Sequence, residues 1–153
     1  MSFPLLSVMI FTPLAGAVLL WLLPARSARY VTAAAMLLTL SAASAAIVAY
    51  DPAGTRFQLL ERVAWIASLN VHYLVAVDGL SLLFLPASAL LFLGSLVASW
   101  NSVSDAPRFH YSLLLLFMTC TLGIFCALDS ILFFFFWELT LIPLYFLLGR
   151  WGV

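Results

Sequence analysis

Five long apolar stretches follow one another along the chain, and no other feature of the sequence limits its fold as strongly. The hydrocarbon core of a bilayer is spanned by about 20 apolar residues in a helix. Helices satisfy every backbone polar group internally, which lipid cannot do. The sequence therefore predicts an all-α integral membrane protein with five transmembrane helices. The expected spans are residues 3–23, 30–50, 80–100, 111–128 and 130–149.

Composition excludes the main alternatives to a membrane protein. Apolar residues make up 66% of the 153-residue chain, and only 8% are charged. A soluble domain carries about 25% charged residues, and a disordered segment is poor in apolar residues. The formal net charge is zero and Lys is absent, so no basic surface for nucleic acid is expected. The bilayer is the expected partner.

Residues 51–77 form the longest polar connection. Arg56–Ile66 mixes charged and apolar residues, and Val71–Val77 is rich in β-branched and aromatic side chains. These patterns predict a short strand or hairpin on the membrane surface. An interfacial amphipathic helix over residues 56–65 is the alternative.

Arginine placement predicts the orientation of the helices. With five spans, Arg26, Arg29, Arg108 and Arg150 fall on one side, and only two arginines lie in the 51–77 loop on the other. Because cytoplasmic loops are enriched in basic residues, we expect the N-terminus outside and the C-terminus in the cytoplasm. The first residues lack the positive charges of a signal peptide, so residues 3–23 are expected to be a true span.

Asp78 and Asp129 each stand just before an apolar stretch. A carboxylate at this position accepts hydrogen bonds from the free N–H groups that begin a helix. We therefore predict that both are helix N-caps.

The cysteines and histidines do not suggest a metal site. Cys120 and Cys126 are six residues apart in one predicted helix, where they point to different sides and are too distant for a disulfide. His72 and His110 are far apart in sequence at the edges of apolar stretches, so they are expected to be interfacial. No spacing typical of zinc or iron–sulfur ligation is present.

Glu138 lies in the middle of the fifth apolar stretch, within Phe133–Tyr145. An ionised carboxylate is costly at bilayer depth and rarely faces lipid, so Glu138 is expected to face other helices or water. Apolar surroundings favour the protonated acid, which makes a proton its natural partner. The alternative is a structural carboxylic acid that hydrogen-bonds another helix.

Pro143 and Tyr145 add to this interpretation. Proline has no N–H, so the carbonyl of Leu139 loses its helical partner one residue beyond Glu138. On a helical wheel Tyr145 falls on the stripe of Glu138, together with Ile131, Phe134 and Gly149. A carboxylate, a freed carbonyl and a hydroxyl suggest a short proton-relay segment.

Three segments resemble a known family. Trp-Glu-Leu-Thr-Leu-Ile-Pro-Leu-Tyr at 137–145, within 135–152, resembles the fifth transmembrane helix of subunit M (chain 4) of proton-translocating NADH–quinone oxidoreductase, respiratory complex I. Residues 71–82 are similar to the entry to that family's third helix, and residues 126–132 to the turn before its fifth. The resemblance covers most of the chain in the proper order.

The resemblance implies a proton-translocating membrane subunit, packed against other antiporter-like subunits of the complex. The Ala- and Arg-rich, Lys-free composition suggests a GC-rich genome and favours a bacterial inner membrane over a mitochondrial one. In this family the glutamate at the position of Glu138 is central to proton translocation and pairs with a lysine in a later helix. Such subunits bind no cofactor themselves. The complex as a whole uses NADH, FMN, iron–sulfur clusters and a quinone such as ubiquinone, so an enzyme role is expected only as part of NADH:quinone oxidoreductase.

Two departures from the family leave other functions open. The family's subunits have about fourteen helices, so this chain resembles their N-terminal third and is interpreted as a truncated form. The fourth stretch also lacks the second carboxylate of some relatives. The alternatives are a subunit of a related cation/proton antiporter or membrane hydrogenase, and a helical scaffold that transports nothing.

Overall fold

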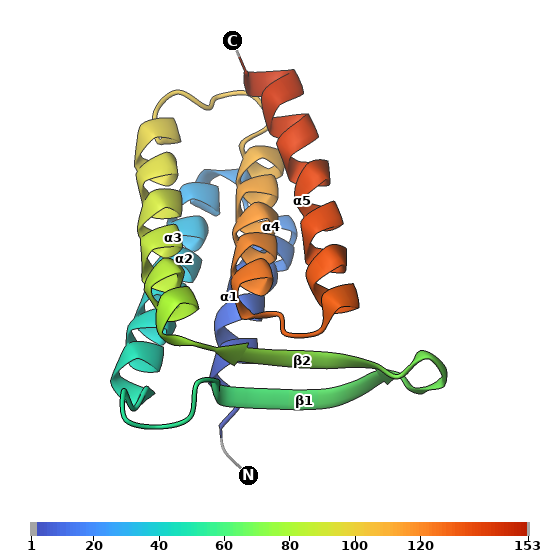
Figure 1. Ribbon diagram of the computed structural model, residues 1–153. Helices are drawn as coiled ribbons and strands as arrows, with labels where there is room; N and C mark the ends of the chain where they lie inside the picture. The colour runs from blue at the N-terminus through green and yellow to red at the C-terminus, as the bar shows by residue number, and fades with distance from the viewer. Residues whose placement is uncertain (1–2, 153) are drawn as a thin grey trace.

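The computed structural model describes residues 3–152 of the chain. It confirms the predicted fold class, because five of its helices are long and apolar enough to cross a membrane. Figure 1 shows them side by side, with both strands at one end of the bundle. The helices are α1 (Leu5–Leu22), α2 (Ala28–Ala49), α3 (Gly79–Ser99), α4 (Pro107–Cys126) and α5 (Ser130–Trp151).

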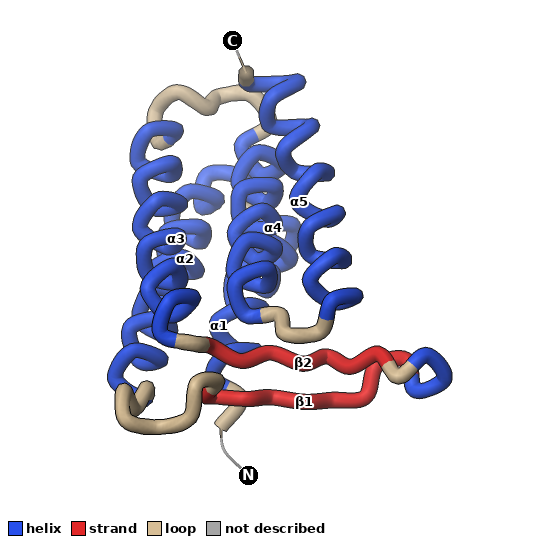
Figure 2. Tube along the Cα trace, in the orientation of Figure 1, coloured by secondary structure: helices blue, strands red, loops and turns tan. Residues whose placement is uncertain are grey.

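The connection between α2 and α3 contains an antiparallel hairpin, as predicted. Strands β1 (Gln58–Ile66) and β2 (Val71–Val77) pair with Val63 opposite Tyr73. Figure 2 shows the hairpin lying across the end of the helices and extending past α5. The alternative helix over residues 56–65 is wrong, because most of this segment pairs with β2, and β-branched and aromatic side chains suit an extended ladder.

Helix α4 begins at Pro107, four residues before the expected start. This first turn is not part of the apolar stretch, because it contains Arg108 and His110. Proline is favourable in a first turn, where its missing N–H would have had no partner. The earlier start places His110 inside the helix.

Helix α4 is the centre of the bundle and contacts the other four helices. Of the 18 most apolar consecutive residues of α4, 61% are buried, compared with 17% of the corresponding residues of α5. The core contains large α4 side chains such as Leu115, Met118 and Leu122. Helix α5 therefore lies at the edge of the five-helix bundle and leaves most of its surface uncovered.

Small residues allow close packing of α1, α2 and α4. A Cβ added to Gly16 would lie 2.7 Å from the Cβ of Ala35 and 3.3 Å from a methyl group of Leu115. Ala43 and Ala46 of α2 are fully buried as well. The alanine-rich second span thus packs closely against α1, where larger side chains would hold the backbones apart.

The end of the bundle opposite the hairpin carries Arg26, Arg29, Arg108 and Arg150, as the arginine pattern predicts. Arg108 donates a hydrogen bond to the Leu23 carbonyl at 2.6 Å and joins α4 to the end of α1. Arg150 forms a 2.9 Å ion pair with Asp105. We call this the arginine end.

Candidate functional site

The orientation of α5 about its own axis is set by a narrow buried stripe. Leu132, Phe136 and Pro143 are the buried residues of this helix. Phe136 packs on Gly123 of α4 so closely that a Cβ on Gly123 would lie 2.6 Å from ring atoms. A glycine that admits an aromatic ring leaves little freedom to rotate the helix.

Glu138 consequently points away from the bundle. At 100° per residue, Glu138 lies 160° around the helix from Phe136, and its side chain is exposed. Within residues 3–152, no ion pair or side-chain hydrogen bond engages the Glu138 carboxylate. The carboxylate therefore lies on the outer surface of α5, where another helix, water or lipid would meet it.

The residues of the predicted stripe around Glu138 lie together on one exposed face of α5. Phe134 is 60% exposed and Tyr145 is 74% exposed, and Ile131 and Gly149 are exposed on the same side. Seven residues separate Glu138 from Tyr145, which is about 10 Å along a helix. No hydrogen bond joins the two side chains in the structure, so a relay between them would need water.

Pro143 is not on this face. It is buried against the bundle, on the side of Leu132 and Phe136. The structure therefore brings Glu138 and Tyr145 to one face and places Pro143 on the other. Pro143 acts on the Glu138 face only through the backbone, by withholding the N–H that the Leu139 carbonyl would accept.

Glu61 is a carboxylate whose structural role could not be predicted from the sequence pattern around it. It lies on β1, yet its carboxylate accepts hydrogen bonds from the backbone N–H groups of Leu6 at 2.8 Å and Ser7 at 3.2 Å. It thus caps α1 from 54 residues away in the sequence. The available signal was that α1 follows Pro4, which offers no side-chain cap of its own.

The Ser7 hydroxyl extends this contact to β2. It donates a hydrogen bond to the Glu61 carboxylate and lies 2.8 Å from the Tyr73 hydroxyl. Burial raises the pKa of Tyr73 to about 12, against a lowering by the Ser7 hydrogen bond, and the nearby Glu61 charge adds to the rise. Tyr73 is therefore protonated at neutral pH.

Asp78 and Asp129 are helix N-caps, as predicted. Asp78 accepts from the Ser81 N–H at 2.8 Å, and the Ser81 hydroxyl accepts in return from the Asp78 N–H. Asp129 accepts from the N–H groups of Ile131 and Leu132. Hydrogen bonds from backbone N–H groups lower the pKa of both carboxyls.

Asp129 also connects α5 to the hairpin. Its carboxylate accepts a 3.2 Å hydrogen bond from the backbone N–H of His72, and the Leu128 N–H donates to the Leu74 carbonyl at 2.9 Å. The hairpin therefore contacts the first turns of α1 through Glu61 and of α5 through Asp129, and it leads directly into α3. Three helix N-termini are held at one end of the bundle.

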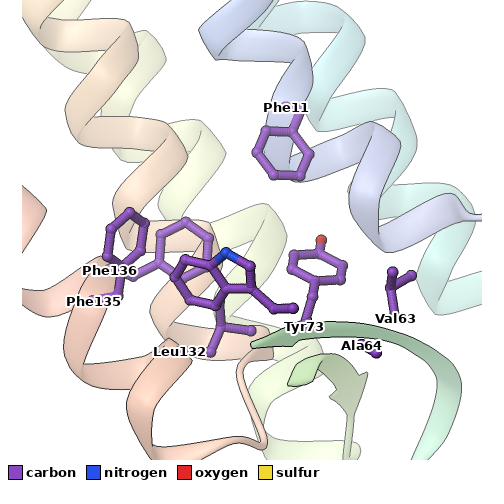
Figure 3. Close-up of a pocket in the computed structure, with 8 residues that line it drawn as sticks. Phe11, Val63, Ala64, Tyr73, Leu132, Phe135 and Phe136 are labelled. Carbon is purple, nitrogen blue, oxygen red and sulfur yellow. The ribbon is translucent and has the colours of Figure 1, made fainter. Parts of the chain in front are cut away.

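An apolar cavity of about 350 Å³ lies under the hairpin. Figure 3 shows Tyr73 and Val63 of the hairpin facing Phe11 of α1 and Phe136 of α5 across it. The Phe11 and Tyr73 ring centroids are 6.1 Å apart. The cavity can hold hydrocarbon, since its lining offers few polar groups.

The histidines differ from one another in environment. His72 on β2 is at the surface, where its Nε2 lies 3.0 Å from a guanidinium nitrogen of Arg62. His110, which was expected to be interfacial, is only 8% exposed inside α4. Both cysteines are free and buried, and within residues 3–152 no three His, Cys, Asp or Glu side chains gather to hold a metal.

Comparison with known proteins gives a consistent set of relatives, although no family model matches the chain. It is 38% identical over 154 residues to NAD(P)H-quinone oxidoreductase chain 4 1 of Synechococcus sp., covering 99% of this chain and 29% of the relative. It is 33% identical to chain 4 2 of Thermosynechococcus vestitus, with the same coverage. It is 34% identical to F(420)H(2) dehydrogenase subunit M of Methanosarcina mazei over 76% of this chain and 23% of the relative.

A solved structure shares the fold. A chain of the membrane-bound sulfane sulfur reductase, an archaeal respiratory membrane complex, matches 94% of this chain with a TM-score of 0.76 at 17% identity, over 22% of that chain. The chain thus spans less than a third of the length of the curated relatives it matches.

Proposed function

The chain is homologous over nearly its whole length to the N-terminal part of NAD(P)H-quinone oxidoreductase chain 4, and on this premise we propose that it contributes to proton translocation through Glu138. In the proposed role, Glu138 takes up and releases a proton while electrons pass from NADH to a quinone elsewhere in the complex.

The position of Glu138 carries this proposal. It is the single Asp or Glu within the five described helices, and it faces outward from α5, away from α4. A carboxylate at bilayer depth is stable when another helix or water covers it. Tyr145 on the same face supplies a hydroxyl, and Pro143 leaves the Leu139 carbonyl free to accept a hydrogen bond.

The homology also supports a proposal about the membrane, the orientation and the partner subunits of the chain. We place the chain in a bacterial inner membrane, with the N-terminus outside and the arginine end in the cytoplasm. Its partners are other membrane subunits of the complex, and NADH, FMN, iron–sulfur clusters and quinone act in other subunits.

The relatives also favour a second candidate for the electron reaction. Chain 4 and F(420)H(2) dehydrogenase subunit M are both similar to this chain at more than 30% identity. Both relatives are subunits of oxidoreductase complexes, but by their names one complex oxidises NAD(P)H and the other F420H2. Membrane vesicles of the host supplied with NADH or with F420H2 would distinguish them, because only the true donor would drive acidification.

The test of Glu138 is a chromosomal Glu138→Gln exchange in the host. Gln keeps the size of the side chain and cannot carry a proton, so NADH-driven acidification of inverted vesicles should fall at least tenfold. Glu138→Asp should retain part of the activity, because the acid remains on a shorter stem. Asp51→Asn, which alters an exposed carboxylate in the turn before β1, is the control for charge removal outside the spans. Unchanged acidification in Glu138→Gln would contradict the proposal.

A further inference from the structure

A cavity of about 520 Å³ lies between α3, α4 and α5 at the arginine end, far from the hairpin and separate from the Glu138 face. Leu147 and Trp151, which line it from α5, lie on the side of that helix opposite Glu138. Several of its lining side chains are polar or carry an N–H group. They are Ser95, Ser99, Ser102, His110 and Trp151.

His110 is the unusual member of this set. Its side chain is more than nine-tenths buried, and its Nδ1 finds no hydrogen-bond partner in the described part of the chain. The Trp151 indole, whose ring centroid is 4.8 Å from that of His110, likewise has an unpartnered Nε1–H within residues 3–152. A buried polar group left unpaired is destabilising, and lipid tails cannot supply the missing partner.

The serines of the cavity have acceptor capacity to offer. Ser95, Ser99 and Ser102 donate their hydroxyls to carbonyls of Leu91, Leu96 and Ala98 at 3.0–3.1 Å. Each hydroxyl oxygen still has a lone pair free to accept. A buried water needs two to four polar partners and roughly 30 Å³. At about 520 Å³ the cavity has room for several waters, and the three serine hydroxyls, His110 and Trp151 are its polar lining groups.

We propose that this cavity is a hydrated vestibule in which His110 binds water and exchanges a proton with the aqueous phase at the arginine end. In the exchange a hydronium ion of the water cluster transfers its proton to the neutral ring nitrogen and becomes water, and the reverse step returns it. No covalent bond to carbon forms and no electron moves.

The charged side chains near His110 are engaged with other partners and form no ion pair with its ring. Arg108 is directed to the Leu23 carbonyl, and Arg150 is paired with Asp105. The Tyr111 hydroxyl donates to the Ser99 carbonyl at 3.2 Å, and α3 contains no charged residue. The proposal does not rest on Glu138, because it concerns a different cavity and a different group.

The first test is solid-state NMR of the full chain in lipid nanodiscs with ¹⁵N-labelled histidine. The chain has two histidines, so in the His72→Gln variant all ¹⁵N-histidine signals come from His110. We expect a cross-peak from water protons to the His110 ring nitrogens, and a reversible shift of those nitrogens when the bulk pH changes. Cross-peaks from lipid acyl chains without any from water would overturn the proposal.

The second test uses cysteine accessibility in a Cys120→Ala, Cys126→Ala background. Ser95→Cys faces the cavity, whereas Val97→Cys, which is closer to the helix end, is 70% exposed on the opposite, lipid-facing side. A charged thiosulfonate reagent should modify Ser95→Cys at least tenfold faster than Val97→Cys, and His110→Phe should slow that reaction. Equal rates, or no reaction at Ser95→Cys, would show that the cavity holds lipid.

Discussion

The ring of Phe136 lies directly on Gly123, and this one contact sets which face of α5 is turned outward. A methyl group on Gly123 would meet three ring atoms at 2.6 Å. Because Glu138 follows Phe136 by two residues, packing of Phe136 inward turns Glu138 outward.

Gly123→Ala should therefore displace α5 and lower the free energy of unfolding by about 1–3 kcal/mol, as expected for overpacking. Thermal unfolding in detergent micelles would measure it. Gly149→Ala is the matched control in the same pair of helices, since no atom lies within 4 Å of its added Cβ. Adding Phe136→Leu to Gly123→Ala should recover part of the loss. Equal stability of the two alanine variants would contradict the packing argument.

Glu61→Gln should weaken the attachment of the hairpin to α1. The amide offers one acceptor where the carboxylate offers two, and the charge that complements the helix N-terminus is lost, so we expect a cost of about 1 kcal/mol. Arg62→Gln is the adjacent control, because Arg62 contacts His72 and not α1. Faster hydrogen exchange at Leu6 and Ser7 in Glu61→Gln alone is the expected result. Similar exchange in both variants would exclude the cap.

Tyr73 should titrate later than an ordinary tyrosine. The chain has five tyrosines, and the pKa of Tyr73 is raised to about 12. Because this pKa lies above that of the unfolded chain, near 10, the contribution of Tyr73 to stability is complete below pH 10 and is lost as the pH rises toward 12. Tyrosinate absorbance should show a late step that Tyr73→Phe removes. A step that persists in Tyr73→Phe would assign it elsewhere.

The membrane orientation can be tested with single cysteines in the background free of Cys120 and Cys126. Ser27→Cys and Ser102→Cys lie at the arginine end and should react with an impermeant reagent only after cells are opened. Ala53→Cys, in the exposed turn before β1, should react in intact cells. Labelling of Ser102→Cys from outside would reverse the predicted orientation.

Sequence patterns alone predicted the elements of this fold because they depend on local chemistry. Apolar runs of bilayer length predict spans wherever they occur, and Asp78 and Asp129 cap the helices they precede through N–H groups two or three residues away. The hairpin followed from β-branched residues in 71–77. The helical wheel also grouped Glu138 with Tyr145, since that relation needs only the helix period.

Relations between distant segments were decided by tertiary structure. Glu61 caps α1 only because the hairpin folds back across the bundle, and 54 residues of chain separate the partners. The outward direction of Glu138 depends on which stripe of an almost uniformly apolar helix is buried. Hydrophobicity does not indicate which stripe is buried, because nearly every α5 position is apolar. The close packing of Phe136 on Gly123 determines it. His110 likewise appeared peripheral by hydropathy and became buried through its packing with Trp151 and α4.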